Sequence, residues 1–134
     1  MRKDIVIPEV KNVHVAAVKE RNDKGEYVWN VYLINKQEST LENVLVSSSG
    51  YKVDQKGQKQ HSSTLRHFLE NVPPLSVKKI EPIIEEVFSL NNEYFVTYFS
   101  KEGMAEKQFV FVPDSILEKN LTEVPFLNCR GVMI

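Results

Sequence analysis

The segment Tyr27–Ile34 constrains the fold of this chain more than any other stretch. It reads Tyr-Val-Trp-Asn-Val-Tyr-Leu-Ile, with aromatic and β-branched residues at both odd and even positions. Such residues favour β-structure, and large side chains on both faces are typical of a central strand covered on both faces, or on one face plus an edge. The segment therefore predicts a strand inside a sheet.

Alternating and β-branched runs separated by turn residues predict further strands. They are expected at Val10–Lys19, Leu41–Val46, Ser76–Glu86, Glu93–Ser100 and Met104–Val112. Thr64–Glu70 fits a strand or one helical turn, and the Pro-Pro corner after it favours the strand. Pro82 cannot donate a ladder hydrogen bond, so its strand is expected at a sheet edge or with a bulge near the proline. The run Ser47–Gly50 is expected to turn, and Lys52–Ser63, with almost no apolar residue, is expected to be a solvated loop.

The segment after Pro113 contains the one helix signal in the chain. Ser115 and Glu118 have the spacing of a capping box, and Pro125 ends the expected helix. Its apolar face consists of Ile116, Leu117, Leu121 and Val124. Together these patterns predict an all-β fold, an immunoglobulin-like two-sheet antiparallel sandwich with one short C-terminal helix, formed by residues 1–134 as a single domain.

Charge and composition narrow the class of function. The chain has 134 residues, with 17 Lys and Arg against 18 Asp and Glu and a formal net charge of -1, so no strong field attracts nucleic acid or an anionic membrane. No apolar run is long enough to predict a membrane span. The run Ile5–Ile7 is shorter than a signal-peptide core, and Cys129 has no second cysteine to pair with, so a cytoplasmic protein is expected.

Common catalytic and metal-binding motifs do not occur at the required spacings. The five glycines lie far apart, which excludes a phosphate-binding loop. His14, His61 and His67 lack the close paired spacing of zinc ligands, and Cys129 lies in an apolar tail where thiols are usually inert. Ser47–Gly50 does not form the Gly-x-Ser-x-Gly elbow of a serine hydrolase. We therefore predict no catalytic residue, no metal and no cofactor.

Aromatic and polar residues on the strands remain as candidates for binding. Both faces of the hairpin Tyr94–Val112 carry large side chains, more than one buried face requires, which favours an exposed aromatic patch. Arg66 and His67 are adjacent on a predicted strand, where alternation places them on opposite faces. The candidate binding residues are Trp29, Arg66, His67, Tyr94 and Tyr98.

These features favour a non-enzymatic protein-interaction module that binds an unknown partner protein or associates with itself, as a monomer or simple dimer. The alternative is a small-ligand binder or an enzyme with a site built from residues distant in sequence, in which Arg66 or His67 combines with carboxylates in a concave sheet face. An RNA-associated accessory role requires a clustered basic face, which the scattered lysines do not predict. Neither nucleic acid nor a membrane is expected as a partner.

Three segments carry a resemblance to known proteins: Trp29–Asn35, Leu41–Val46 and Asn91–Phe99. In them the chain resembles a group of small uncharacterised bacterial proteins, some of which are labelled as a phenylalanyl-tRNA synthetase alpha subunit. The label implies ATP-dependent aminoacylation in a larger class II catalytic domain, with arginine-bearing motifs that this chain does not contain. The segments, followed by a Pro-Pro corner, are also similar to accessory sandwich modules that bind other proteins.

Overall fold

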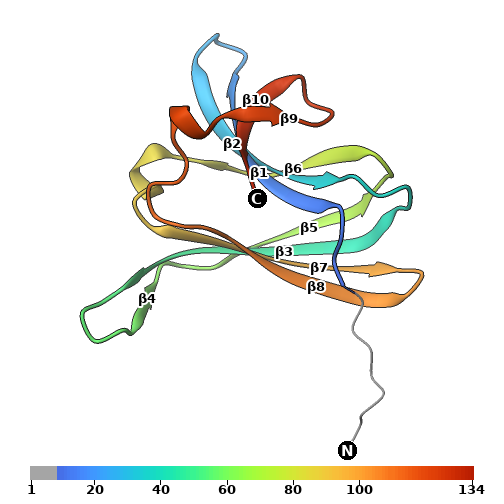
Figure 1. Ribbon diagram of the computed structural model, residues 1–134, viewed down its shortest axis with the longest axis horizontal. Helices are drawn as coiled ribbons and strands as arrows, with labels where there is room; N and C mark the ends of the chain where they lie inside the picture. The colour runs from blue at the N-terminus through green and yellow to red at the C-terminus, as the bar shows by residue number, and fades with distance from the viewer. Residues whose placement is uncertain (1–8) are drawn as a thin grey trace, which may run out of the picture.

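Antiparallel pairing links every strand of the computed structural model, which describes residues 9–134, into one of two sheets (Figure 1). The predicted run Ile5–Ile7 lies outside the described residues. Sheet A has the spatial order β6, β2, β1, β10, β9. Its strands are β1 (Val13–Arg21), β2 (Tyr27–Asn35), β6 (Ser76–Ile83), β9 (Thr122–Val124) and β10 (Cys129–Met133).

Sheet B contains the other five strands. Strand β3 lies between β7 on one edge and both β4 and β5 on the other, and β8 pairs with β7. Its strands are β3 (Leu41–Val53), β4 (Lys59–His61), β5 (Leu65–Val72), β7 (Asn91–Ser100) and β8 (Gly103–Phe111). The all-β prediction and the antiparallel two-sheet arrangement are thus confirmed.

The main hydrophobic core contains inward-facing residues of both sheets. In β2, Trp29, Val31 and Leu33 point into this core, and in β7 Tyr94, Val96 and Tyr98 do the same. A second, smaller cluster consists of Ala16 and Val18 of β1 and Ile34 of β2, which have the opposite parity, together with Val124 of β9. Strand β2 is therefore covered on both faces, as its sequence predicts.

A bulge near Pro82 shapes the edge strand β6. Tyr32 of β2 pairs with Lys79, but Val31, the residue before it, pairs with Glu81. Ile80 of β6 is therefore an extra residue without a partner in β2. The edge position and the irregularity near the proline are both confirmed. Because bulges re-aim side chains, Glu81 lies opposite the inward-facing Val31 and its carboxyl group points toward sheet B, while Ile80 is also buried.

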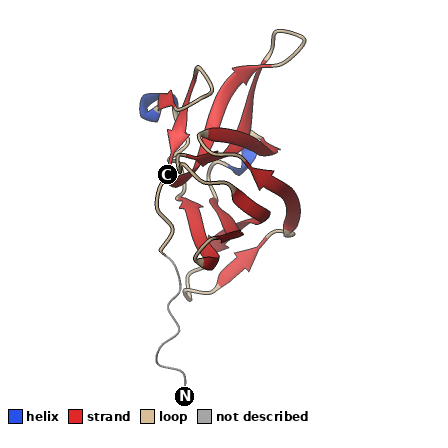
Figure 2. Ribbon diagram, turned by 90° about the vertical axis from the view of Figure 1, so that its right-hand side faces the viewer, coloured by secondary structure: helices blue, strands red, loops and turns tan. Residues whose placement is uncertain are grey.

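The predicted C-terminal helix is wrong. The segment forms only a 3-10 turn, η2 (Glu118–Asn120), visible with a second short turn, η1 (Glu85–Val87), in Figure 2. Ser115 Oγ donates to the main-chain oxygen of Val112 instead of accepting from a helical N–H. Ile116 is buried in the main core and Leu121 packs partly against it, while Leu117 is exposed, so the segment has no continuous helical face.

Two predicted loops contain strand. Ser47–Gly50 does not turn, since β3 continues through it to Val53, paired with β7 along this stretch. Within the expected loop Lys52–Ser63, the short strand β4 pairs back onto β3, and the turn between them is closed by Asp54. Figure 1 shows this hairpin reaching beyond the rest of the fold. Pairing on both edges outweighs the weak strand preference of serine and glycine.

Candidate functional site

The face of sheet B that points away from the core carries large apolar side chains from four strands. Its rings are Phe68, Phe95 and Phe99, with 61%, 39% and 47% of their surface exposed. Leu45 lies directly opposite Phe68, and Met104 lies directly opposite Phe99. We call these five residues the outer patch. Leu45 is also opposite Thr97, which lies between Phe95 and Phe99 on the same face of β7, so the two pairs are diagonal neighbours on one sheet face.

The size of the outer patch follows from these exposures. The exposed fractions of the three phenylalanines add up to the surface of about one and a half such residues. For aromatic residues of this size, that is roughly 300 Å². Leu45 and Met104, 40% and 52% exposed, add to this area. Apolar patches of roughly 300–600 Å² are the largest on ordinary monomeric proteins and are often functional. The outer patch is thus in the range of interaction surfaces.

Charged residues lie at the two margins of the outer patch. Arg66 on β5 shares a row of paired residues with Ser47, Phe95 and Gln108, which runs across the whole sheet. Glu106 on β8 is in the next row, opposite Thr97. Both charged residues are exposed. Glu42 of β3, directly opposite Phe99, and Glu93 of β7, two residues before Phe95, lie on the same face. The outer patch therefore has an apolar centre bordered by one positive and three negative residues.

The aromatic residues chosen from the sequence lie on the buried side. Trp29 packs edge-on against Phe88, with 5.3 Å between ring centroids, and Tyr94 and Tyr98 are in the main core. The excess of large side chains in the hairpin β7–β8 is real, but Phe95 and Phe99 carry the exposed part of it. The opposite facing of Arg66 and His67 is confirmed, since His67 bonds inward and Arg66 is exposed.

Glu81 is the centre of a polar network between the sheets. Its Oε1 accepts from Ser48 Oγ and from His67 Nε2, each at 2.7 Å, and its Oε2 accepts from the hydroxyl of Tyr94 at 3.0 Å. Glu81 belongs to sheet A, whereas its three donors come from three strands of sheet B. Burial raises the pKa of Tyr94 well above its usual range, so this hydroxyl is a neutral donor.

This network lacks the geometry of a catalytic triad. A histidine base must bond the nucleophilic hydroxyl, but Ser48 and His67 both bond the same oxygen of Glu81. Ser48 is also buried. The sequence placed His67 and Tyr94 among the candidates; the structure brings both to Glu81. Glu81 itself was missed because its inward direction depends on the bulge in β6.

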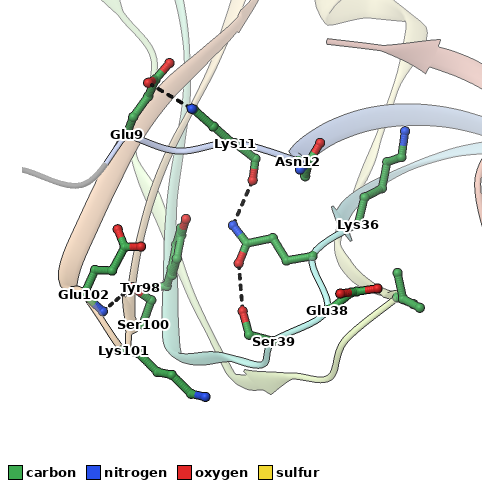
Figure 3. A pocket seen from close by; sticks show the side chains of 12 residues that line it. Glu9, Lys11, Asn12, Lys36, Glu38, Ser39, Tyr98, Ser100, Lys101 and Glu102 are labelled. Atoms are coloured by element: carbon green, nitrogen blue, oxygen red, sulfur yellow. Dashed lines mark hydrogen bonds and ion pairs between the residues drawn. The ribbon is translucent and has the colours of Figure 1, made fainter.

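A polar hollow of about 690 Å³ lies at the end of the fold where the β2–β3 and β7–β8 connections meet (Figure 3). Gln37 bridges it: Nε2 donates to the main-chain oxygen of Lys11 at 2.8 Å, and Oε1 accepts from Ser39 Oγ at 3.2 Å. Tyr98 also lines it, and burial raises the pKa of this phenol. The charged lining residues are Glu9, Lys11, Lys36, Glu38, Lys101 and Glu102.

Residues 9–134 contain no group of three or more His, Cys, Asp and Glu side chains that can hold a metal ion. The three histidines have separate surroundings. Nδ1 of His14 is 3.3 Å from the main-chain oxygen of Ile134, His61 stacks against Tyr51, and His67 bonds Glu81. Cys129 is a partly buried free thiol. The candidate site is therefore the outer patch, with the polar hollow as a second candidate.

Comparison with known proteins gives no family for this chain. No protein-family model matches the sequence, and no curated protein matches it. The resemblance to proteins labelled as a synthetase subunit therefore stays a prediction. Across the described part of the chain, no helix has the length and apolar character needed to cross a membrane.

Proposed function

We propose that this protein is a non-enzymatic protein-interaction module that binds its partner through the outer patch. The observation that carries the proposal is the exposure of Phe68, Phe95 and Phe99 on one connected sheet face. Interfaces are rich in aromatic residues at their centre and polar at their rim. The outer patch, with Arg66 and Glu106 at its margins, has this composition.

The polar network around Glu81 supports a binding role over catalysis. Its donors and acceptors are used to join the two sheets, and the Ser48 hydroxyl donates its hydrogen bond to a carboxylate that also accepts from two other side chains. A buried carboxylate with several donors stabilises a defined packing of the sheets. It thereby fixes how sheet B packs on sheet A.

We further propose that the fold is immunoglobulin-like, formed by residues 1–134 as one domain. In that fold the first, second and fifth strands share one sheet, while the third pairs with the sixth, which pairs with the seventh. Strands β1, β2 and β6 have the first arrangement, and β3, β7 and β8 have the second. Strand β5 then extends the second sheet, and β9 and β10 extend the first.

A second candidate function is binding of a small zwitterionic ligand in the polar hollow. Its volume of about 690 Å³ is within the range of ligand sites, and its three lysines and three glutamates offer both signs of charge. Titration of the labelled protein with free amino acids tests this function by amide NMR shifts. Saturable shifts confined to Gln37, Tyr98 and their neighbours support it, and unchanged spectra refute it.

Site-specific photocrosslinking tests the interaction function. A benzophenone amino acid replaces Phe99 in the outer patch, and in a matched control it replaces Phe126, which is 50% exposed but lies in the loop between β9 and β10. We expect defined protein adducts from position 99 in cells and none of the same mass from position 126. Equal adducts from both positions, or none from position 99, contradict the proposed function.

A further inference from the structure

A second hollow, of about 330 Å³, opens between the two sheets at the side where β5 and β6 are the outermost strands. Ser48 and Tyr94 of sheet B and Glu81 of sheet A form its polar part. We call it the edge hollow. It shares no lining residue with the polar hollow or with the outer patch, which lies on the opposite face of sheet B. Its volume is at the lower end of the range of ligand sites.

Apolar side chains form much of the wall of the edge hollow. They include Leu65 at the start of β5, Ile83 at the end of β6, and Ile84 and Val87 in the segment that follows β6. Ile83 is buried, whereas Leu65 and Ile84 are 54% and 60% exposed, so these two border the mouth. Ligand sites commonly combine an apolar wall with a small number of polar groups. The wall of the edge hollow therefore suits the carbon skeleton of a small molecule.

The charge in the edge hollow is negative. Among the described residues, Glu81 is the only charged one that lines it, and the Glu81 side chain is 13% exposed. Its Oε1 accepts from Ser48 and His67, but its Oε2 accepts from Tyr94 alone. Each carboxylate oxygen has two lone pairs. Oε2 of Glu81 can therefore accept one more hydrogen bond.

The hydroxyl groups near Glu81 already use their protons. Ser48 and Tyr94 donate to the carboxylate, and Ser62 Oγ donates to the main-chain oxygen of Ser63. A hydroxyl has one proton to donate but can still accept through its oxygen. The polar part of the edge hollow thus offers a ligand acceptors and a negative charge, and its complement is a positively charged donor.

We propose that the edge hollow binds a small primary amine with an apolar body. The ammonium group donates to Oε2 of Glu81, and its two other protons reach the oxygens of Ser48 and Tyr94. The apolar body lies against Leu65 and Ile84 at the mouth. This inference does not rest on the proposed function, because the outer patch and the edge hollow have no residue in common.

Amide NMR titration of the full chain with three probes of similar shape tests the proposal. The probes are 2-phenylethylamine, which is positively charged at neutral pH, the neutral 2-phenylethanol and the negatively charged 3-phenylpropionate. We expect saturable shifts with the amine, with a dissociation constant of about 1 mM or below, at Gly50, Ser63 and Ile84, which line the edge hollow.

The two other probes measure how much the charge contributes. We expect the alcohol to bind on the order of 10-fold more weakly than the amine, because a hydrogen bond between charged groups is stronger than one that a neutral hydroxyl donates. The carboxylate probe is expected to give no saturable shift, since Glu81 repels it. The absence of saturable shifts with the amine, or equal binding of the amine and either other probe, overturns the proposal.

Variants at the mouth locate the site without disturbing the contacts of Glu81. Ile84→Lys and Ile84→Glu place opposite charges at one exposed position. We expect Ile84→Lys to weaken amine binding on the order of 10-fold, because the new charge repels the ammonium group, and Ile84→Glu to leave it unchanged or stronger. Phe126→Lys, the matched control in the loop between β9 and β10, is expected to bind like the wild type.

Unchanged binding in Ile84→Lys, or equal weakening by Ile84→Lys and Ile84→Glu, overturns the proposal. Glu81→Gln tests the carboxylate directly, with its fold checked by circular dichroism. We expect it to bind the amine on the order of 10-fold more weakly than the wild type. Wild-type affinity in a folded Glu81→Gln variant contradicts the role of Glu81.

Discussion

The network around Glu81 makes a quantitative prediction about what joins the two sheets. Tyr94→Phe removes a hydroxyl that donates to a largely buried carboxylate over 3.0 Å and leaves the ring in place. A hydrogen bond to a charged group contributes about 1.5–3 kcal/mol. We therefore expect Tyr94→Phe to lower the free energy of unfolding by about 2 kcal/mol, and the thermal midpoint by roughly 5–10 °C for a chain of this size.

A double-mutant cycle with Glu81→Gln isolates the contact itself. The amide has nearly the shape of the carboxylate but no charge, so the bond from Tyr94 becomes a neutral one worth about 1 kcal/mol. In the Glu81→Gln background, Tyr94→Phe should therefore cost about 1 kcal/mol less than in the wild type. The difference is the coupling energy between the two side chains.

Urea unfolding followed by circular dichroism measures all four proteins of the cycle. Tyr27→Phe is the matched control, because the Tyr27 hydroxyl also bonds a charged group, Arg21, but at an exposed site. Its effect should stay within about 0.5 kcal/mol. If Tyr94→Phe changes stability no more than Tyr27→Phe, or if the cycle shows no coupling, Glu81 does not join the sheets in the way described.

Three further predictions concern the rest of the fold. Gly131→Ala should lower the free energy of unfolding in urea by about 1–3 kcal/mol, because the new Cβ lies 2.6 Å from a main-chain oxygen of β1. Gly50→Ala should lower it less, because its new Cβ meets a flexible leucine side chain at 3.2 Å. Burial lowers the pKa of His14 in the folded protein, so on acidification the unfolded chain binds a proton at His14 before the folded chain does. The free energy of unfolding should therefore fall as the pH drops from the ordinary histidine pKa through the pKa in the folded state. His14→Asn should flatten this fall in unfolding curves measured between pH about 7.5 and about 5.5. Ile116→Ala should lower the free energy of unfolding by about 2–4 kcal/mol, and Leu117→Ala by under about 1 kcal/mol. Equal losses of stability in thermal melts would mean that both residues are buried, as the helix predicted from the sequence requires.

Local sequence patterns determined the strongest strands and their surroundings. The aromatic and β-branched run of β2 fixes a strand covered on both faces, because only such a strand can bury large side chains of both parities. Pro82 favours an edge strand or a bulge, because a residue without an N–H leaves one ladder hydrogen bond unmade. The β7–β8 hairpin follows from two alternating runs around a Lys-Glu-Gly turn. In each case the deciding residues are neighbours in the chain.

The direction in which β7 faces was decided only by the tertiary structure. Tyr94, Val96 and Tyr98 alternate with Phe95, Thr97 and Phe99, and hydrophobicity alone does not say which set is buried. The pairing of β7 with β3 and the packing of sheet B on sheet A bury the tyrosines. The candidate residues Tyr94 and Tyr98 therefore lie on the buried face, and Phe95 and Phe99 carry the exposed aromatic surface that the hairpin predicts.

Long-range pairing also decided the serine run, the C-terminal segment and the position of Glu81. Ser47–Gly50 is a strand because β5 and β7 supply partners on its two edges. The capping sequence at Ser115 and Glu118 starts no α-helix: Ser115 bonds the main-chain oxygen of Val112, and Ile116 packs in the main core among residues distant in sequence. Glu81 points inward because of a one-residue bulge. These outcomes depend on partners distant in sequence, which no local pattern contains.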